Sequence, residues 1–229
     1  MTANYWRNTM RFEDINDLLK PGYLPIESGV VEYSDGMKTV VALARMPRVR
    51  AKMVTWWFRY LGGTEQYKLW HPTDHLFSDW EGRQPGTHIG SSHLVHEYLG
   101  GADGPIYKLR INFRDPHEFY DPARYATLNG AAICARIGSL DEPINAGLMT
   151  HFVRNTDAGC EMRSRFFLGH VESRELGVTF DAAKQAEIRA GLVTSELARR
   201  LHQHCTEEMS YLGELLPIMY RQVTGDTAF

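Results

Sequence analysis

The clearest periodic pattern lies near the C-terminal end of the chain, where apolar residues recur every three or four positions. This spacing is typical of a buried helix face, and it predicts one long helix over residues 181–213, with Asp181 as its N-cap. His204 and Glu208 fall on the same face, one turn apart, and a buried carboxylate needs a compensating partner. The apolar residues of this face are Val193, Leu197, Leu201, Tyr211, Leu212 and Leu215.

Upstream of this helix, the sequence predicts mostly short strands that are separated by turn residues. Residues 1–37 are expected to form an N-terminal extension with a short helix at 12–19, and residues 38–229 the main domain. Apolar residues at helical spacing predict a helix over 49–62, and residues 155–159 suit the connection of a hairpin. The predicted strands are 39–46, 92–100, 105–113, 131–138, 147–155 and 160–171.

This order of elements predicts an α+β fold, in which a curved antiparallel sheet carries the long C-terminal helix across it. Such a sheet can wrap around the helix and leave a cavity between the two layers. The apolar face of the helix would then form one wall of that cavity. On this interpretation, His204 and Glu208 face a pocket and not a solid core.

Composition narrows the class of protein. A chain of 229 residues is long enough for one large domain, or for a domain with a small extension. The net charge is −3, with 25 basic and 28 acidic residues, which argues against nucleic acid or an anionic membrane as the main partner. We find neither an apolar run long enough for a transmembrane helix nor the apolar core of a signal peptide. The three cysteines form no CxxC pair, so we expect inert thiols in a reduced, cytoplasmic setting.

Two segments carry candidate metal ligands. His204 and Glu208 present a nitrogen and a carboxylate from one helix face and can hold a divalent metal, for which zinc is the usual choice. The alternative is a simple His–Glu hydrogen bond inside the core. In residues 65–75, His71 and His75 flank a proline and an aspartate. They either cap a turn, or one histidine is a ligand that the other histidine or the aspartate supports.

A third candidate segment is residues 92–100. Strand alternation puts Val95, Glu97 and Leu99 on one face, and Leu94, His96 and Tyr98 on the other. Both faces are partly apolar, so the pattern leaves open which of them is buried. Glu97 is therefore either a carboxylate in apolar surroundings or a solvated edge residue.

Together these segments resemble the 2,4-diacetylphloroglucinol hydrolase and phloretin hydrolase family, zinc enzymes that cleave the carbon–carbon bond between a phenolic ring and an acyl group. The resemblance rests on four features in family order: the block from Tyr67 to His75, residues 96–98 followed by two glycines, His151, and the terminal pair of His204 and Glu208. It implies a Bet v 1-like helix-grip fold, bound Zn²⁺, and a small phenolic ketone of the acylphloroglucinol or dihydrochalcone type as substrate.

The resemblance also implies roles for individual residues. The family's zinc ligands fall on His75, Glu97, His204 and Glu208, which leaves His71 as a supporting residue. Its catalytic groups fall on Tyr67, His151 and Glu97. The substrate-contacting positions would be Tyr67, His151, Tyr98 and Phe166, with Trp56 and Trp57 as further aromatic candidates. Phe166 stands where the family has a tyrosine.

Other interpretations remain open at this level. A zinc hydrolase of this fold could act on a non-aromatic β-diketone or an ester, and a non-catalytic carrier of a small ligand could share the fold. A homodimer is also left open. A cysteine nucleophile is a further alternative, but nothing selects a base for Cys134, Cys160 or Cys205. The remaining histidines without a partner pattern are predicted at the surface or in loops: His88, His93, His117 and His170.

Overall fold

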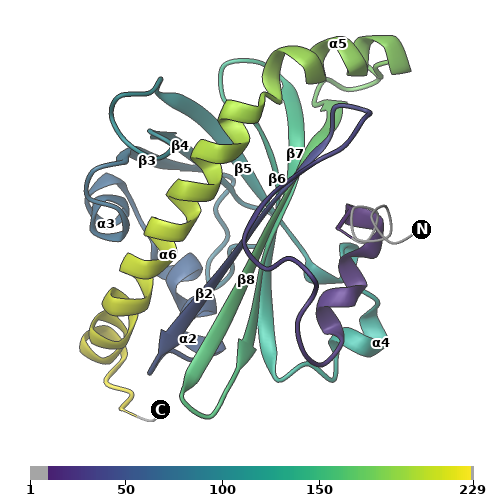
Figure 1. The fold of residues 1–229 in the computed structure, drawn as a ribbon. Helices are drawn as coiled ribbons and strands as arrows, with labels where there is room; N and C mark the ends of the chain where they lie inside the picture. Colours follow the sequence, from purple (N-terminus) through teal and green to yellow (C-terminus); the bar gives the residue numbers. More distant parts are fainter. Residues whose placement is uncertain (1–9, 228–229) are drawn as a thin grey trace.

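A computed structural model describes residues 10–227 and shows one eight-stranded antiparallel sheet that curves around a long helix (Figure 1). The strand order across the sheet is β1-β2-β8-β7-β6-β5-β4-β3, so the second strand of the chain pairs with the last. The strands are β1 (Gly29–Glu32), β2 (Lys38–Pro47), β3 (His75–Glu81), β4 (Ser92–Glu97), β5 (Tyr107–Arg114), β6 (Gly130–Ser139), β7 (Ile144–Asn155) and β8 (Gly159–Ser173).

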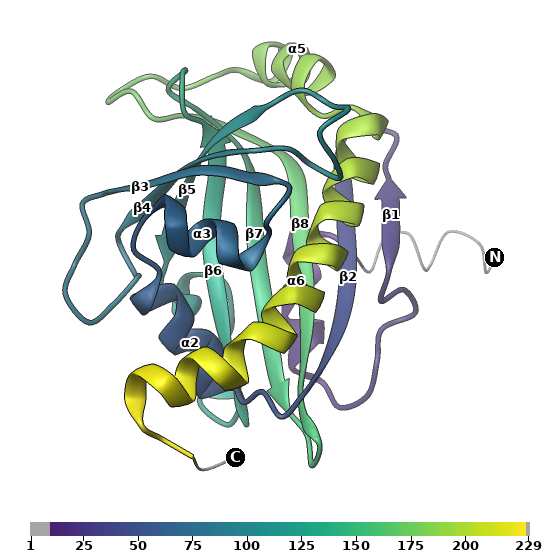
Figure 2. The same cartoon turned by 90° about the vertical axis from the view of Figure 1, so that its left-hand side faces the viewer.

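The helices lie on both faces of this sheet. Two of them, α2 (Ala51–Tyr60) and α3 (Thr64–Trp70), lie beside the long α6 (Ser195–Thr224) on the concave face (Figure 2). The helix α6 crosses the sheet and packs against β1 and β2 as well as against α2 and α3. The others are η1 (Phe12–Leu19), η2 (Pro116–Glu118), α4 (Pro122–Tyr125) and α5 (Ala182–Leu192). The predicted fold, a curved sheet that grips a long C-terminal helix, is therefore confirmed.

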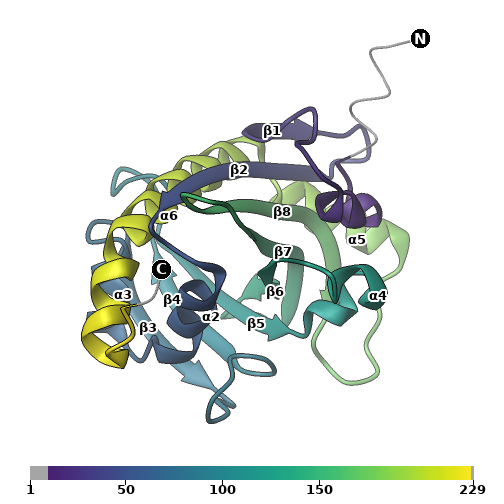
Figure 3. The ribbon, with the colours of Figure 1, turned by 90° about the horizontal axis from the view of Figure 1, so that it is seen from below.

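The core has two layers because helical segments cover both faces of the sheet. The larger layer fills the space between the concave face and α2, α3 and α6. A smaller one, including Phe152 and Phe167, lies under η1 and α4 on the convex face (Figure 3). Glu27 also reaches this face, where it forms ion pairs at 2.5 Å with Arg163 and at 2.5 Å with Arg165. Because both faces of the sheet are covered, β8 is buried at every position from residue 159 to 169, charged side chains included.

The prediction of one helix over residues 181–213 is wrong in two respects. Asp181 does cap a helix, since its side chain accepts a hydrogen bond from the Lys184 amide, but that helix is α5 and ends at residue 192. Thr194 then caps α6, which continues to residue 224. Tyr211, predicted on the buried face, is 43% exposed.

The other predicted elements are found close to their expected ranges. The six predicted strands, the two helices at 12–19 and 49–62, and the turn between β7 and β8 are all present. The sequence does not predict β1, β3, α3, η2 or α4. Residues of the proposed extension form η1 and β1, and the division at residue 37 stays a prediction. No helix within residues 10–227 has the length and apolar character needed to span a membrane.

Candidate functional site

Two histidines and two glutamates converge at one end of the space between the sheet and α6. His204 and Glu208 come from α6, and His204 Nε2 lies 2.8 Å from Glu208 Oε2. His75 and Glu97 face each other across the β3–β4 pair. His75 Nε2 lies 3.8 Å from Glu208 Oε2 and 4.0 Å from Glu97 Oε2. All four side chains are buried, so the segments predicted as ligands meet at one point.

The hydrogen bonds of the two imidazoles set their tautomers. His75 Nδ1 lies 2.8 Å from the carbonyl oxygen of Tyr67, which can only accept, so this nitrogen carries the proton. His204 Nδ1 likewise donates to Asp74 Oδ2 at 2.9 Å. In the neutral form of each ring, Nε2 is therefore left with a lone pair. Each Nε2 atom is buried and lacks a hydrogen-bond partner among the described residues. Two orphaned lone pairs beside two carboxylates suit a metal ion.

The cluster also carries an excess of negative charge. Burial alone would lower the pKa of His204, but the Glu208 carboxylate and the hydrogen bond to Asp74 raise it well above its ordinary range. Burial would raise the pKa of Glu208, yet the imidazoles of His204 and His75 hold it far below its ordinary range. The carboxylates thus demand a cation, which is either a proton on His204 or a metal.

His71 lies beside this cluster but is oriented differently. Its Nδ1 accepts a hydrogen bond from the Asp74 amide at 3.1 Å, so the proton of the neutral ring sits on Nε2. That nitrogen lies 3.7 Å from Asp74 Oδ2 and 3.6 Å from Glu207 Oε2. Asp74 also accepts hydrogen bonds from the amides of Gly100 and Gly101. Asp74 therefore orients His204, and the His71 ring stacks on the His204 ring with 5.0 Å between centroids. The lone pair of the neutral His71 ring is already used by the Asp74 amide.

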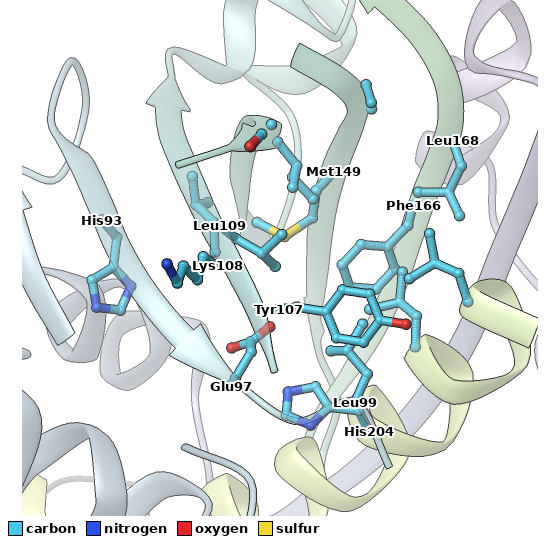
Figure 4. Close-up of a pocket in the computed structure, with 18 of the residues that line it drawn as sticks. His93, Glu97, Leu99, Tyr107, Lys108, Leu109, Met149, Phe166, Leu168 and His204 are labelled. Atoms are coloured by element: carbon cyan, nitrogen blue, oxygen red, sulfur yellow. The ribbon is translucent and has the colours of Figure 1, made fainter. Parts of the chain in front are cut away.

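A cavity of about 390 Å³ opens from the cluster between the sheet and α6 (Figure 4). Its far walls are apolar, with Leu109 and Met149 on the sheet side and Leu197 and Leu201 on α6. The polar side chains at its inner end are Tyr67, His93, Glu97, His151, His204 and Glu208. A molecule bound here would have one polar end against the cluster and the remainder in apolar surroundings.

Tyr67 links the cavity to the cluster. Its hydroxyl donates a hydrogen bond to Glu97, and its ring stacks on His75 with 3.6 Å between centroids and 6° between planes. Burial and the neighbouring Glu97 charge raise the pKa of Tyr67 well above its ordinary value. The phenol therefore stays protonated and is available as a donor.

His151 and Phe166 lie together in the cavity wall, with ring centroids 5.8 Å apart. His151 Nδ1 lies 2.8 Å from Ser164 Oγ. Burial lowers the pKa of His151 to about 4, so its ring is neutral at neutral pH. A neutral imidazole at this position can accept or pass on a proton.

Several expectations about individual residues are wrong. Tyr98, which directly follows β4, is not among the residues that line the cavity. Trp56 and Trp57 do not line it either. His88 and His93, predicted at the surface, are only 4% and 2% exposed. His93 lines the cavity, and the alternation of β4 could have revealed it, since it lies four residues from Glu97 on the same face.

Comparisons with known proteins point to one family. Residues 10–221 match the family described as "DAPG hydrolase PhiG domain". A 2,4-diacetylphloroglucinol hydrolase of a Pseudomonas species is 26% identical over 93% of this chain and 77% of its own length. The enzyme of the same name from Pseudomonas protegens is also 26% identical, over 93% of this chain and 74% of its own.

Solved structures that resemble this fold have a much lower sequence identity to the chain. The ginseng major latex-like protein 151 from Panax ginseng is 8% identical and covers 79% of this chain and 97% of its own, with a TM-score of 0.46. The di-domain ARO/CYC StfQ of steffimycin biosynthesis is 12% identical and covers 81% of this chain and 52% of its own, with a TM-score of 0.46. At these scores the structural similarity carries no functional argument.

Proposed function

Because the chain belongs to the DAPG hydrolase PhiG domain family, we propose that it hydrolyses the carbon–carbon bond between a polyphenol ring and an acyl group. It is an enzyme, a hydrolase that acts on carbon–carbon bonds in ketonic substances. The substrate class is an acylphloroglucinol or a related dihydrochalcone. The observation that carries the proposal is the buried cluster of two histidines and two glutamates at the polar end of an apolar cavity.

The metal would be held by His75, Glu97, His204 and Glu208. Supporting this, the Nε2 atoms of both histidines are buried without a hydrogen-bond partner, and two imidazoles with two carboxylates match the donors and the charge that Zn²⁺ takes. When bound, the metal supplies Lewis acidity that activates water and polarises the acyl oxygen.

Side chains of the protein would donate and accept the protons of the reaction. Net hydrolysis adds the hydroxyl of water to the acyl carbon and hydrogen to the ring carbon, and yields a carboxylic acid and the deacylated phenol. The ring can leave only after protonation of that carbon, which converts it to a keto tautomer. Tyr67 is a protonated donor held by Glu97, and His151 is a neutral imidazole that can take the proton of a phenolic oxygen. Glu97 serves as the base beside the metal.

Phe166 bears on substrate choice. It lines the cavity where the family pattern has a tyrosine, so this wall offers a ring face but no hydroxyl. A substrate with fewer polar groups on that side is therefore favoured. For this reason, an alicyclic β-diketone and a simple aryl ester belong in the test as competing substrates.

Metal analysis and a substrate panel test the proposal. The untagged protein should contain about one zinc per chain and convert an acylphloroglucinol to the free phenol and acid, both identified by mass spectrometry. Cleavage of the diketone or the ester alone would contradict the substrate class. Tight binding of the phenolic ketone without turnover, in the zinc-loaded protein, would contradict the enzymatic proposal and favour a carrier.

A further inference from the structure

His93 is a polar residue of the cavity that none of the steps above involves. It lies on β4, and Figure 4 shows its ring on the same wall as Glu97. The two residues are four positions apart, so their Cα atoms are about 13 Å apart along the strand. His93 therefore lies beyond the metal cluster, where the part of a substrate remote from the acyl group would be bound.

The ring of His93 is held in one orientation. It stacks on Trp80 with 4.5 Å between centroids and 19° between planes. It also packs against Tyr67 in an edge arrangement, with 5.0 Å between ring centroids. Its Nε2 lies 2.7 Å from Ser78 Oγ. These two ring contacts and the hydrogen bond at Nε2 fix the direction of its Nδ1.

The second ring nitrogen of His93, Nδ1, is free to form a hydrogen bond. It has no hydrogen-bond partner among residues 10–227, and His93 is one of the residues that line the cavity. Burial lowers the pKa of His93 to about 3, and the ring is neutral at neutral pH. A neutral imidazole can accept a hydrogen bond at this nitrogen, or donate one if the Ser78 hydroxyl donates to Nε2.

We infer that His93 is a substrate-binding residue whose Nδ1 forms a hydrogen bond with the phenolic hydroxyl farthest from the acyl group. This inference rests on the proposed function, since it takes the substrate to be an acylated polyphenol. A buried site that hydrogen-bonds a hydroxyl discriminates strongly against an analogue that lacks it, because the partner is then left unpaired.

Three substitutions at this position separate the two ring nitrogens. His93→Asn places an amide near the position of Nδ1, His93→Gln places one near Nε2, and His93→Phe keeps only the ring. His88→Phe is a matched control, because His88 is a buried imidazole with neither nitrogen hydrogen-bonded to a described residue, and it lies outside the cavity lining. Metal content and thermal unfolding show that each variant is loaded and folded.

The measurement is the ratio of kcat/KM for a 2,4,6-trihydroxy and a 2,6-dihydroxy acylbenzene. The chemical effect of the missing hydroxyl is common to all variants and cancels when their ratios are compared. His93→Phe and His93→Gln should lower the ratio about tenfold or more, whereas His93→Asn and His88→Phe should largely keep it. A folded, loaded His93→Phe with the wild-type ratio would overturn the inference.

Product binding separates this inference from the proposed function. If the wild-type protein cleaves neither ketone, the proposed function fails. Calorimetry with 1,3,5-trihydroxybenzene and 1,3-dihydroxybenzene still tests His93, because it needs no turnover. Wild-type protein should prefer the trihydroxy compound, and His93→Gln should lose that preference. Equal affinity of the wild-type protein for both compounds would refute the contact.

Discussion

At the scale of the residue, hydrogen bonds at one ring nitrogen decide what the other can do. His75 and His204 each donate from Nδ1 to an oxygen, and both present a bare Nε2 to the same point. His71 has nearly the same surroundings but accepts a backbone N–H at Nδ1, which reverses its role. The sequence could not distinguish His71 from His75 on its residues alone, because both follow the same short helix. Only the backbone geometry around Asp74 separates them.

The first prediction concerns these ligands. His204→Ala should lose zinc, because it removes one of two lone pairs and leaves Glu208 without its closest partner. The measurement is metal content by elemental analysis of the folded, untagged protein. His202→Ala is the control on the same helix, since His202 bonds to Ser28 away from the cluster. Full zinc content in His204→Ala would refute the ligand assignment.

A second prediction concerns Tyr67. Tyr67→Phe keeps the ring that stacks on His75 and removes only the hydroxyl that donates to Glu97. The protein should retain its metal, while kcat should fall about 10²-fold or more, as expected for loss of a positioned proton donor. Steady-state kinetics with an acylphloroglucinol checks this. An unchanged kcat would remove Tyr67 from the catalytic groups.

At the scale of the element, strands with clear alternation were predicted and irregular ones were not. In β4, alternation groups His93, Val95 and Glu97 on one face, but both faces carry apolar residues, so only the structure shows that this face is the buried one. The edge strand β3 has a register shift after His75 and mixed burial, so it has no readable period. The sequence pattern does not reveal the break before α6, because apolar residues continue in helical register past Thr194. The new helix start depends on one hydrogen bond, which the Thr194 side chain accepts from the Leu197 amide.

The third prediction tests that cap. Thr194→Ala should destabilise the protein by about 1 kcal/mol, because the Leu197 amide loses its partner at the start of a helix that packs against the sheet. Asp181→Ala removes an equivalent cap from α5, which has no buried residues, and should cost less. Urea unfolding followed by circular dichroism measures both. Equal costs would mean that the two helices unfold with the same cooperativity.

At the scale of the whole molecule, the candidate metal would join segments that are distant in the sequence. Its proposed ligands lie on β3, β4 and α6, so the ion would cross-link one edge of the sheet to the helix. The fourth prediction is that chelation lowers the thermal unfolding midpoint. At a zinc concentration about 100 times the Kd, the stabilisation lost would be about 2.7 kcal/mol. An unchanged midpoint after verified zinc removal would contradict the cross-link.

The fifth prediction concerns the convex face, where Glu27 joins the N-terminal segment to β8. Burial alone would raise the pKa of Glu27, but Arg163 and Arg165 hold it below its ordinary value of 4.5. This contribution to stability is therefore complete above pH 4.5 and is lost as the pH falls through the lower folded value. Glu27→Gln should cost about 3 kcal/mol at pH 7. The difference from wild type should shrink below pH 4.5 in urea unfolding, and a constant difference would refute the linkage.

The strand order has a consequence for the newly made chain. Because β2 lies between β1 and β8, its second edge has no partner until residues 159–173 have left the ribosome. During translation, β2 presents an unpaired, largely apolar edge while the residues between it and β8 are added. Such an edge invites pairing with other chains, so synthesis of this protein should depend on chaperones that shield nascent strands.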